Sequence, residues 1–183
     1  MAGVTADVRA RIGRLTLANP VLAAAGTFGY GEEFRRTVRL EQLGALVVKT
    51  LTRQPRDGNP PPRLVETPAG MLNSVGLQNV GLAAFLREKL PRLRALGVPV
   101  VVSILDDSPE GLAEMACQLD RAEGVAAIEL NLSCPNLYDR SKLQAPGSRQ
   151  EPLQPSASSL EPIMVAQDAE ATAMFVAAAR AAT

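Results

Sequence analysis

The segment from Asn131 to Asn136 sets one thiol, that of Cys134, between two side-chain amides. It directly follows the apolar run 125–130, which has the length and composition of a buried strand. Sheets of parallel strands carry their reacting groups at the carboxyl ends of the strands, so this position favours a chemical role for Cys134. A cysteine can equally be a small buried hydrophobe. That alternative suits Cys117, which lies in an amphipathic pattern, better than Cys134, whose asparagine neighbours would then be buried without a structural reason.

Two further segments place polar groups in comparable positions. Lys49 closes the apolar run 46–48, where a lysine either extends to solvent or meets an anion. In the segment 73–77, Asn73 offers both a donor and an acceptor, and Gly76 permits close backbone approach, although an ordinary turn explains the segment equally well. Together, a cation, three amides and a thiol, with no acid and no histidine, suit a planar, amide-rich, anionic ligand.

Composition narrows the classes of partner. The chain has 183 residues, 46% of them hydrophobic, and equal numbers of acidic and basic side chains, 19 of each. We therefore expect one domain with a real core and a small-molecule ligand, and neither nucleic acid nor a membrane as a partner. The absence of histidine and of any C-x-x-C pair argues against a metal site. Because no apolar leader or run of ~20 apolar residues occurs, we expect a cytoplasmic protein.

Strands alternate with helices along the chain. The patterns predict a hairpin over 8–17, strands at 20–24, 44–50, 98–105 and 126–131, and helices at 32–40, 82–93, 108–122 and 168–182. The helix at 108–122 has the clearest start, with Ser108 as N-cap and Pro109 at the first helical position. This order predicts an α/β fold of the TIM-barrel (β/α)8 type. About four β/α units are present, a half-barrel behind an N-terminal β-hairpin, because eight units need roughly 250 residues.

Two segments show no periodicity. Residues 51–70 contain five prolines and predict a long ordered loop. Residues 137–163 contain four prolines and five serines and predict a mobile Pro/Ser-rich insertion, with a structured subdomain as the alternative. We therefore interpret residues 1–183 as a single N-terminal portion of a barrel.

Several motifs, in order along the chain, closely resemble the catalytic subunit of class 1B dihydroorotate dehydrogenases. They are Asn19-Pro20-Val21-Leu22 with Gly26-Thr27-Phe28-Gly29, Val48-Lys49-Thr50, the stretch from Pro68 to Asn79, and the stretch from Glu129 to Asn136. A weaker resemblance resumes over 165–183. The resemblance implies an FMN-containing TIM barrel, an oxidoreductase that converts dihydroorotate to orotate in pyrimidine biosynthesis.

The resemblance also implies roles for single residues. Cys134 would be the base that removes the C5 proton while hydride passes from C6 to FMN. Substrate would be held by Lys49, Asn73, Ser74, Val75, Gly76, Leu77, Asn131 and Asn136. The flavin would contact Ala25, Gly26, Lys49, Thr50, Ser103 and Asn131. Ala25 stands where serine is common in relatives and Ser103 where asparagine is common, and each lost hydrogen bond is worth only about 1 kcal/mol.

The resemblance further implies partners. An electron-transfer subunit carrying FAD and an iron-sulfur cluster would pass electrons to NAD, and we expect a homo-oligomer. Two alternatives remain open. The strands that would complete the barrel are missing, which together with 137–163 suggests a non-catalytic remnant or interaction module. A related FMN enzyme that oxidises another dihydropyrimidine is the other alternative, although Lys49 favours a carboxylated substrate.

Overall fold

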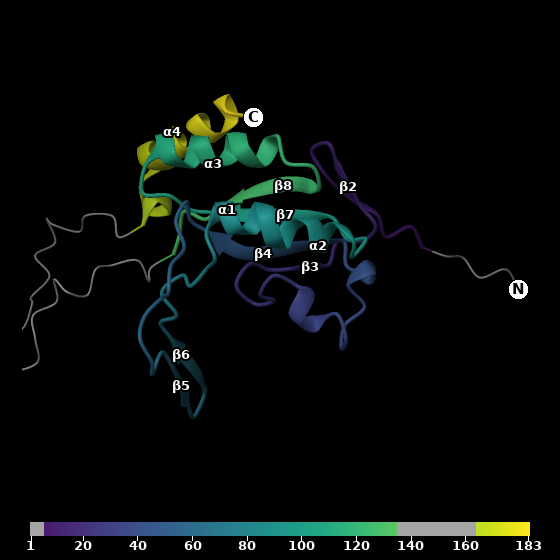
Figure 1. Ribbon diagram of the computed structural model, residues 1–183, viewed down its shortest axis with the longest axis horizontal. Helices are drawn as coiled ribbons and strands as arrows, with labels where there is room; N and C mark the ends of the chain where they lie inside the picture. Colours follow the sequence, from purple (N-terminus) through teal and green to yellow (C-terminus); the bar gives the residue numbers. More distant parts are fainter. Residues whose placement is uncertain (1–5, 135–163) are drawn as a thin grey trace, which may run out of the picture.

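A parallel sheet forms the centre of the molecule (Figure 1). The computed structural model of the chain describes residues 6–134 and 164–183, so Asn136 and the predicted insertion 137–163 lie outside the described residues. The sheet has the order β3–β4–β7–β8, with β3 at Leu22–Ala23, β4 at Ala45–Leu51, β7 at Val100–Ile104 and β8 at Val125–Leu130. Every neighbouring pair is parallel. This arrangement confirms the predicted α/β fold with four parallel strands.

Helices cover one face of this sheet. The first runs without a break through α1 (Leu82–Ala84), a π-helical turn (Phe85–Lys89) and α2 (Leu90–Arg94). The other two, α3 (Pro109–Asp120) and α4 (Ala169–Ala181), stack on one another above β8 (Figure 1). Side chains from all of them form one core with the strands. In the described part of the chain, no helix is both long and apolar enough to cross a membrane.

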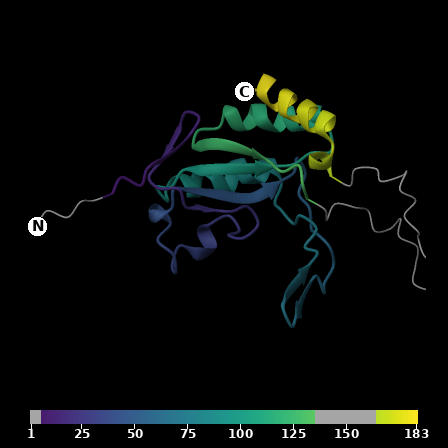
Figure 2. The same cartoon turned by 180° about the vertical axis from the view of Figure 1, so that it is seen from behind.

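The predicted N-terminal hairpin is confirmed and packs against the opposite face. Its strands, β1 (Ala10–Ile12) and β2 (Leu15–Leu17), pair antiparallel. Leu17 packs with Val47 and Val101 in a second apolar cluster. Because the hairpin lies beside the amino ends of the sheet strands (Figures 1 and 2), the carboxyl ends on the other side stay open for function.

Strand β4 contains a β-bulge at the point where chemistry is expected. Its pairing with β7 shifts between Val48 and Leu51, so that Lys49 and Thr50 together stand opposite Ser103. The bulge breaks the strict alternation of side chains along a strand and increases the local twist. Val48 and Leu51 both pack in the core between the sheet and the helices. Lys49 and Thr50, which lie between them at the strand end, are not part of that core.

The helix predicted over 32–40 is wrong. Two short 3-10 turns, Glu32–Phe34 and Leu40–Gln42, occupy this segment. An amphipathic helix is stabilised mainly by a buried apolar stripe. Here Leu40 is buried but Val38 is 38% exposed, so the segment has too few anchors to hold a regular helix against the core.

The long loop predicted over 51–70 is also wrong in part. Strand β5 (Leu64–Thr67) pairs antiparallel with β6 (Gly70–Asn73), and this hairpin projects away from the sheet (Figures 1 and 2). Proline removes a backbone donor and disfavours strand interiors. Pro62 precedes the hairpin and Pro68 lies in its turn, so every strand residue keeps its N–H group. The prolines therefore lie before the hairpin and in its turn, where they do not disrupt the pairing of its strands.

The amino end of α3 is held by a compact set of hydrogen bonds. Ser108 Oγ accepts from Gly111 N at 3.1 Å, which confirms the predicted N-cap. Asp106 Oδ1 in turn accepts from Ser108 N at 3.1 Å and from Ser108 Oγ at 3.0 Å. Arg53 Nε donates to Asp106 Oδ2 at 2.7 Å and ties this cap to the end of β4.

We expect Gly111→Ala to destabilise the fold. A methyl group at Gly111 would collide with Asp106 Oδ1. Overpacking of this kind typically lowers the free energy of unfolding by about 1–3 kcal/mol. Urea denaturation would measure the loss, with Gly70→Ala as a control because nothing lies within 4 Å of a Cβ at Gly70. Equal stability of the two variants would contradict the expectation.

Candidate active site

A chain of side-chain hydrogen bonds joins the carboxyl ends of β4, β7 and β8. Asn131 Nδ2 donates to Thr50 Oγ1 at 3.1 Å, and the hydroxyls of Thr50 and Ser103 are 2.9 Å apart. Thr50 and Ser103 are buried, with 3% and 0% of their surface exposed. A hydroxyl has one proton and can accept as well, so Thr50 can accept from Asn131 and donate to Ser103. Three of the predicted site residues therefore lie together.

We expect Thr50→Val to weaken this junction. Valine keeps the shape of threonine but leaves the Asn131 amide and the Ser103 hydroxyl without their partner. A buried polar group without a partner costs about 1–3 kcal/mol. The free energy of unfolding from urea denaturation would show the loss. Thr16→Val is the control, because Thr16 is an exposed residue of strand β2, and this variant should stay within about 0.5 kcal/mol of the wild type.

The β4 bulge brings Lys49 beside the loop that follows β3. Lys49 Nζ lies 3.7 Å from the position that a Cβ would take on Gly26, which has φ +83°. Lys49 N also donates to Gly29 O at 2.9 Å, and both Lys49 and Ala25 are half-buried. Within the described residues Lys49 forms no ion pair with a carboxylate. A half-buried ammonium group in this position can attract an anion.

The segment 73–77 leaves β6 and turns through two left-handed residues. Asn73 is exposed, whereas Gly76 (φ +75°) and Leu77 (φ +57°) are buried. Among the described residues, none accepts a hydrogen bond from the backbone N–H groups of 75–77. Consecutive free N–H groups in a turn can bind an anion. No hydrogen bond in the described part joins this segment to Lys49, Thr50 or Asn131, so it forms a second group of predicted residues.

Cys134 lies three residues after Asn131, the residue that follows β8 and donates a hydrogen bond to Thr50. It is half-buried and belongs to neither apolar core cluster. The turn before it is closed by Ser133 N, which donates to Asn131 Oδ1 at 3.3 Å, and Leu132 O accepts from Ala166 N at 3.0 Å. Cys117 in α3 is equally half-buried, so what distinguishes Cys134 is its place after the strand end, with the partial exposure that a reacting thiol needs.

Three residues near these groups were not predicted from the sequence. Glu129 stands opposite Ser103 in the β7–β8 register, so the two side chains share one face of the sheet and a carboxylate joins the set. Its position two residues before Asn131 was the available signal, because alternate strand residues share a face. Asn59 and Asn79, the other two, donate hydrogen bonds to carbonyls of the segment 73–77.

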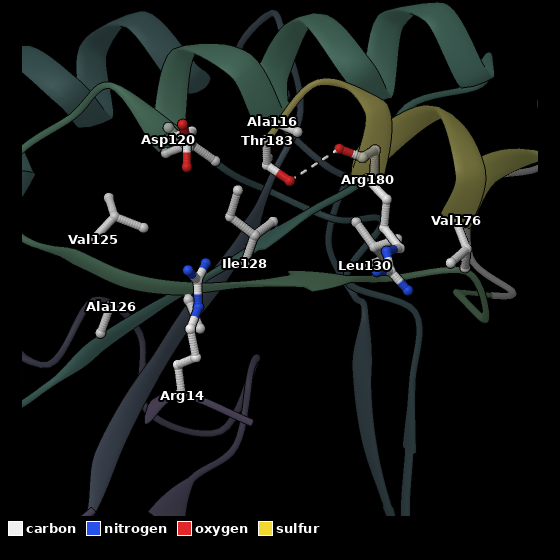
Figure 3. A pocket seen from close by; sticks show the side chains of 13 residues that line it. Arg14, Ala116, Asp120, Val125, Ala126, Ile128, Leu130, Val176, Arg180 and Thr183 are labelled. Carbon is white, nitrogen blue, oxygen red and sulfur yellow. Dashed lines mark hydrogen bonds between the residues drawn. The ribbon is translucent and has the colours of Figure 1, made fainter. Parts of the chain in front are cut away.

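The structure also has a hollow that does not coincide with these residues. Its volume is about 510 Å³ and it lies beside β8, between that strand and the helices α3 and α4 (Figure 3). Arg14, Asp120, Val176 and Arg180 are among its lining side chains, and none of the predicted site residues lines it. We place the candidate site at the strand ends instead, because the side chains with suitable chemistry gather there.

Comparisons with known proteins agree with the motifs at the strand ends. The family model "Dihydroorotate dehydrogenase" matches residues 8–166. A protein of Trichlorobacter lovleyi is 54% identical over 126 residues, which are 69% of this chain and 41% of the relative. A protein of Desulforudis audaxviator is 56% identical over 126 residues, with the same coverages of 69% and 41%.

A third relative, from Geobacter sulfurreducens, is 51% identical over 131 residues, or 72% of this chain and 43% of the relative. All three relatives carry the name "Dihydroorotate dehydrogenase B (NAD(+)), catalytic subunit". The chain spans less than half of the length of these relatives.

Proposed function

This chain belongs to the dihydroorotate dehydrogenase family, and on that basis we propose that it supplies the base and the substrate-binding groups for oxidation of dihydroorotate to orotate in pyrimidine biosynthesis. The observation that carries the proposal is the convergence of side chains from adjacent strands at one edge of the sheet. Thr50, Ser103 and Asn131 are hydrogen-bonded there, with Lys49 beside them and Cys134 just beyond.

The proposed reaction breaks two C–H bonds and forms the C5=C6 double bond of orotate. Cys134 removes the proton at C5, which moves to the thiolate sulfur. FMN, when bound, supplies the acceptor for the hydride that leaves C6. General-base catalysis by a positioned side chain is worth about 10²–10⁴-fold in rate. The half-buried position of Cys134 after the Asn131 turn supports this role.

Two groups in the chain would hold the substrate. Lys49 would face the carboxylate, and the N–H groups of Val75, Gly76 and Leu77, from which no described residue accepts, could donate to the same anion. The side-chain amides of Asn73 and Asn131 would pair with the ring, because an amide offers both a donor and an acceptor to an imide. Ser74 would line the same loop, and Asn136, outside the described residues, would complete the set beside Asn131.

The strand ends fit a flavin on chemical grounds. The small residues Ala25 and Gly26 leave room beside Lys49, whose ammonium could lie near the electron-rich part of the ring. Thr50 and Asn131 would add hydrogen-bonding groups. The Ser103 hydroxyl is bonded to Thr50 and fully buried, so it would support the flavin through Thr50.

The relatives' names include "catalytic subunit" and "NAD(+)", and this wording supports a proposal about partners. We propose an electron-transfer subunit carrying FAD and an iron-sulfur cluster, a homo-oligomer of the catalytic chain, and a cytoplasmic location. We also propose that residues 1–183 form one portion of a barrel and that 137–163 is an insertion in it.

The test is to produce this chain together with the part of the Trichlorobacter lovleyi relative that lies beyond the matched stretch. With FMN added, we expect dihydroorotate to reduce the flavin and orotate to appear in equal amount. An assembly that binds FMN but is reduced by dihydrouracil and not by dihydroorotate would favour another dihydropyrimidine. An assembly that binds FMN and neither substrate would favour an interaction module.

A further inference from the structure

Leu77 has a backbone conformation that needs support from its surroundings. It is the one non-glycine residue with positive φ in the described part of the chain, at +57°, and it is 4% exposed. A left-handed conformation costs an L-residue roughly 1–2 kcal/mol. The glycine before it is left-handed as well. Two consecutive residues of this kind stay ordered only where neighbouring groups determine the path of the backbone.

Asn79 holds one end of this turn. Its Nδ2 donates to Leu77 O at 2.8 Å and to Thr52 Oγ1 at 3.0 Å. Its Oδ1 accepts from Gly81 N at 2.9 Å and from Thr52 N at 3.2 Å. The Thr52 hydroxyl donates its proton to Gln54 O at 2.6 Å, which leaves its lone pairs for Asn79. Both protons and both lone-pair directions of the Asn79 amide are therefore used within the protein.

Asn59 holds the other end. Its Nδ2 lies 2.9 Å from both Ser74 O and Ser74 Oγ, and its backbone N donates to Val75 O at 3.0 Å. Gly76 packs so closely here that a Cβ would come within 2.8 Å of Asn59 Cγ. The carbonyls of Ser74, Val75 and Leu77 thus all accept bonds from these two asparagines.

We propose that Asn79 and Asn59 are positioning residues, which hold the backbone of 74–77 in its ligand-binding shape before the substrate arrives. This inference rests on the proposed function of the loop. Asn79 does not need to touch the substrate, because it is 6% exposed and has no unused hydrogen-bonding group. The two asparagines bond to the carbonyls of this segment, and no described residue accepts a hydrogen bond from the N–H groups of 75–77, so these groups can donate to an anion.

The variants Asn79→Asp and Asn59→Asp test this role with little change in shape. Each keeps acceptor oxygens but replaces a donating Nδ2 by an oxygen that repels the loop carbonyl. Asn19→Asp is a matched control: Asn19 Nδ2 donates to Gln42 O at 2.8 Å and its Oδ1 accepts from Val21 N at 3.0 Å. It makes the same kind of loop-to-loop bridge, but in front of β3, at the amino end of the sheet.

The first readout is residue-resolved hydrogen exchange of the protein without ligand. We expect Asn79→Asp to speed the exchange of the Asn59 amide at least tenfold, although this amide bonds to Val75 O and not to residue 79. Asn19→Asp should leave that amide unchanged. If the exchange of the Asn59 amide is the same in Asn79→Asp and the wild type, the inference is overturned, whatever the protein does with dihydroorotate.

The second readout is steady-state kinetics of the FMN-loaded assembly described above. We expect the KM for dihydroorotate to rise roughly tenfold in Asn79→Asp and Asn59→Asp, with kcat changed much less, because a loose loop must be ordered by the substrate. A variant that lowers the unfolding temperature but leaves KM unchanged would show a structural role only and would overturn the inference. Failure of the wild type to oxidise dihydroorotate would count against the proposed function, while the exchange data would still decide whether the two asparagines hold the loop.

Discussion

Cys134→Ala is expected to lower kcat for dihydroorotate oxidation by about 10²–10⁴-fold, the usual contribution of a positioned general base. The methyl group of alanine cannot accept the C5 proton, whereas the groups proposed to hold the ring and its carboxylate remain. Orotate should therefore bind to the FMN-loaded variant about as tightly as to the wild type. Because Cys134 lies outside both apolar core clusters, the fold should persist.

The measurement is flavin reduction by dihydroorotate in a stopped-flow instrument, together with an orotate titration followed by the flavin spectrum. Cys117→Ala serves as the control, since Cys117 is the other half-buried cysteine and lies in α3 away from the strand ends. Normal reduction by Cys134→Ala would exclude the thiol as the base. Equal losses in both cysteine variants would indicate a general effect on the fold.

Lys49→Met is expected to change stability and substrate affinity in opposite directions. Methionine keeps the apolar stem of lysine and removes a half-buried charge, so the free energy of unfolding should stay the same or rise. Hydrogen bonds to a charged group are worth about 1.5–3 kcal/mol. If Lys49 binds the carboxylate, its loss should raise the KM for dihydroorotate by roughly 10–150-fold.

Urea denaturation and steady-state kinetics of the same preparation would show the two effects. Lys89→Met is the control, because Lys89 is also a half-buried lysine but pairs with Glu32 at 3.5 Å and lies over the Tyr30 ring on the helix side. A normal KM in Lys49→Met would mean that the ammonium group extends to solvent and does not bind the substrate. A loss of both stability and affinity would point to a structural role.

The sequence predicted the elements that depend on local chemistry. The start of α3 was predicted correctly because Ser108 and Pro109 satisfy the first turn through their own side chains and ring geometry. The helix at 32–40 was not, because its formation depends on how much of Val38 and its neighbours the rest of the fold can bury. Hairpin β5–β6 was missed because the prolines around it obscured two short strands whose residues are all exposed.

The family resemblance implied that Thr50, Ser103 and Asn131 all contact the flavin, and the structure joins these three by hydrogen bonds. The rule that parallel strands bring their carboxyl ends together predicted that Lys49, the segment 73–77 and Asn131 would gather, but not how they are oriented. The bulge that sets Lys49 and Thr50 opposite one residue depends on the pairing of β4 with β7, a contact about 50 residues apart in the chain. Asn59 likewise reaches a partner 15 residues away.

The order of the strands in the sheet has a consequence for synthesis on the ribosome. Each of β4, β7 and β8 pairs with the strand of this sheet that precedes it along the chain, so the sheet can grow in the order in which its strands emerge. At every stage the newest strand is the open edge of the nascent sheet. On β8 that edge carries Glu129, and a charge on an open edge discourages pairing with a neighbouring nascent chain. We therefore expect the residue that brings a carboxylate to the site face also to discourage pairing of the growing sheet with another chain.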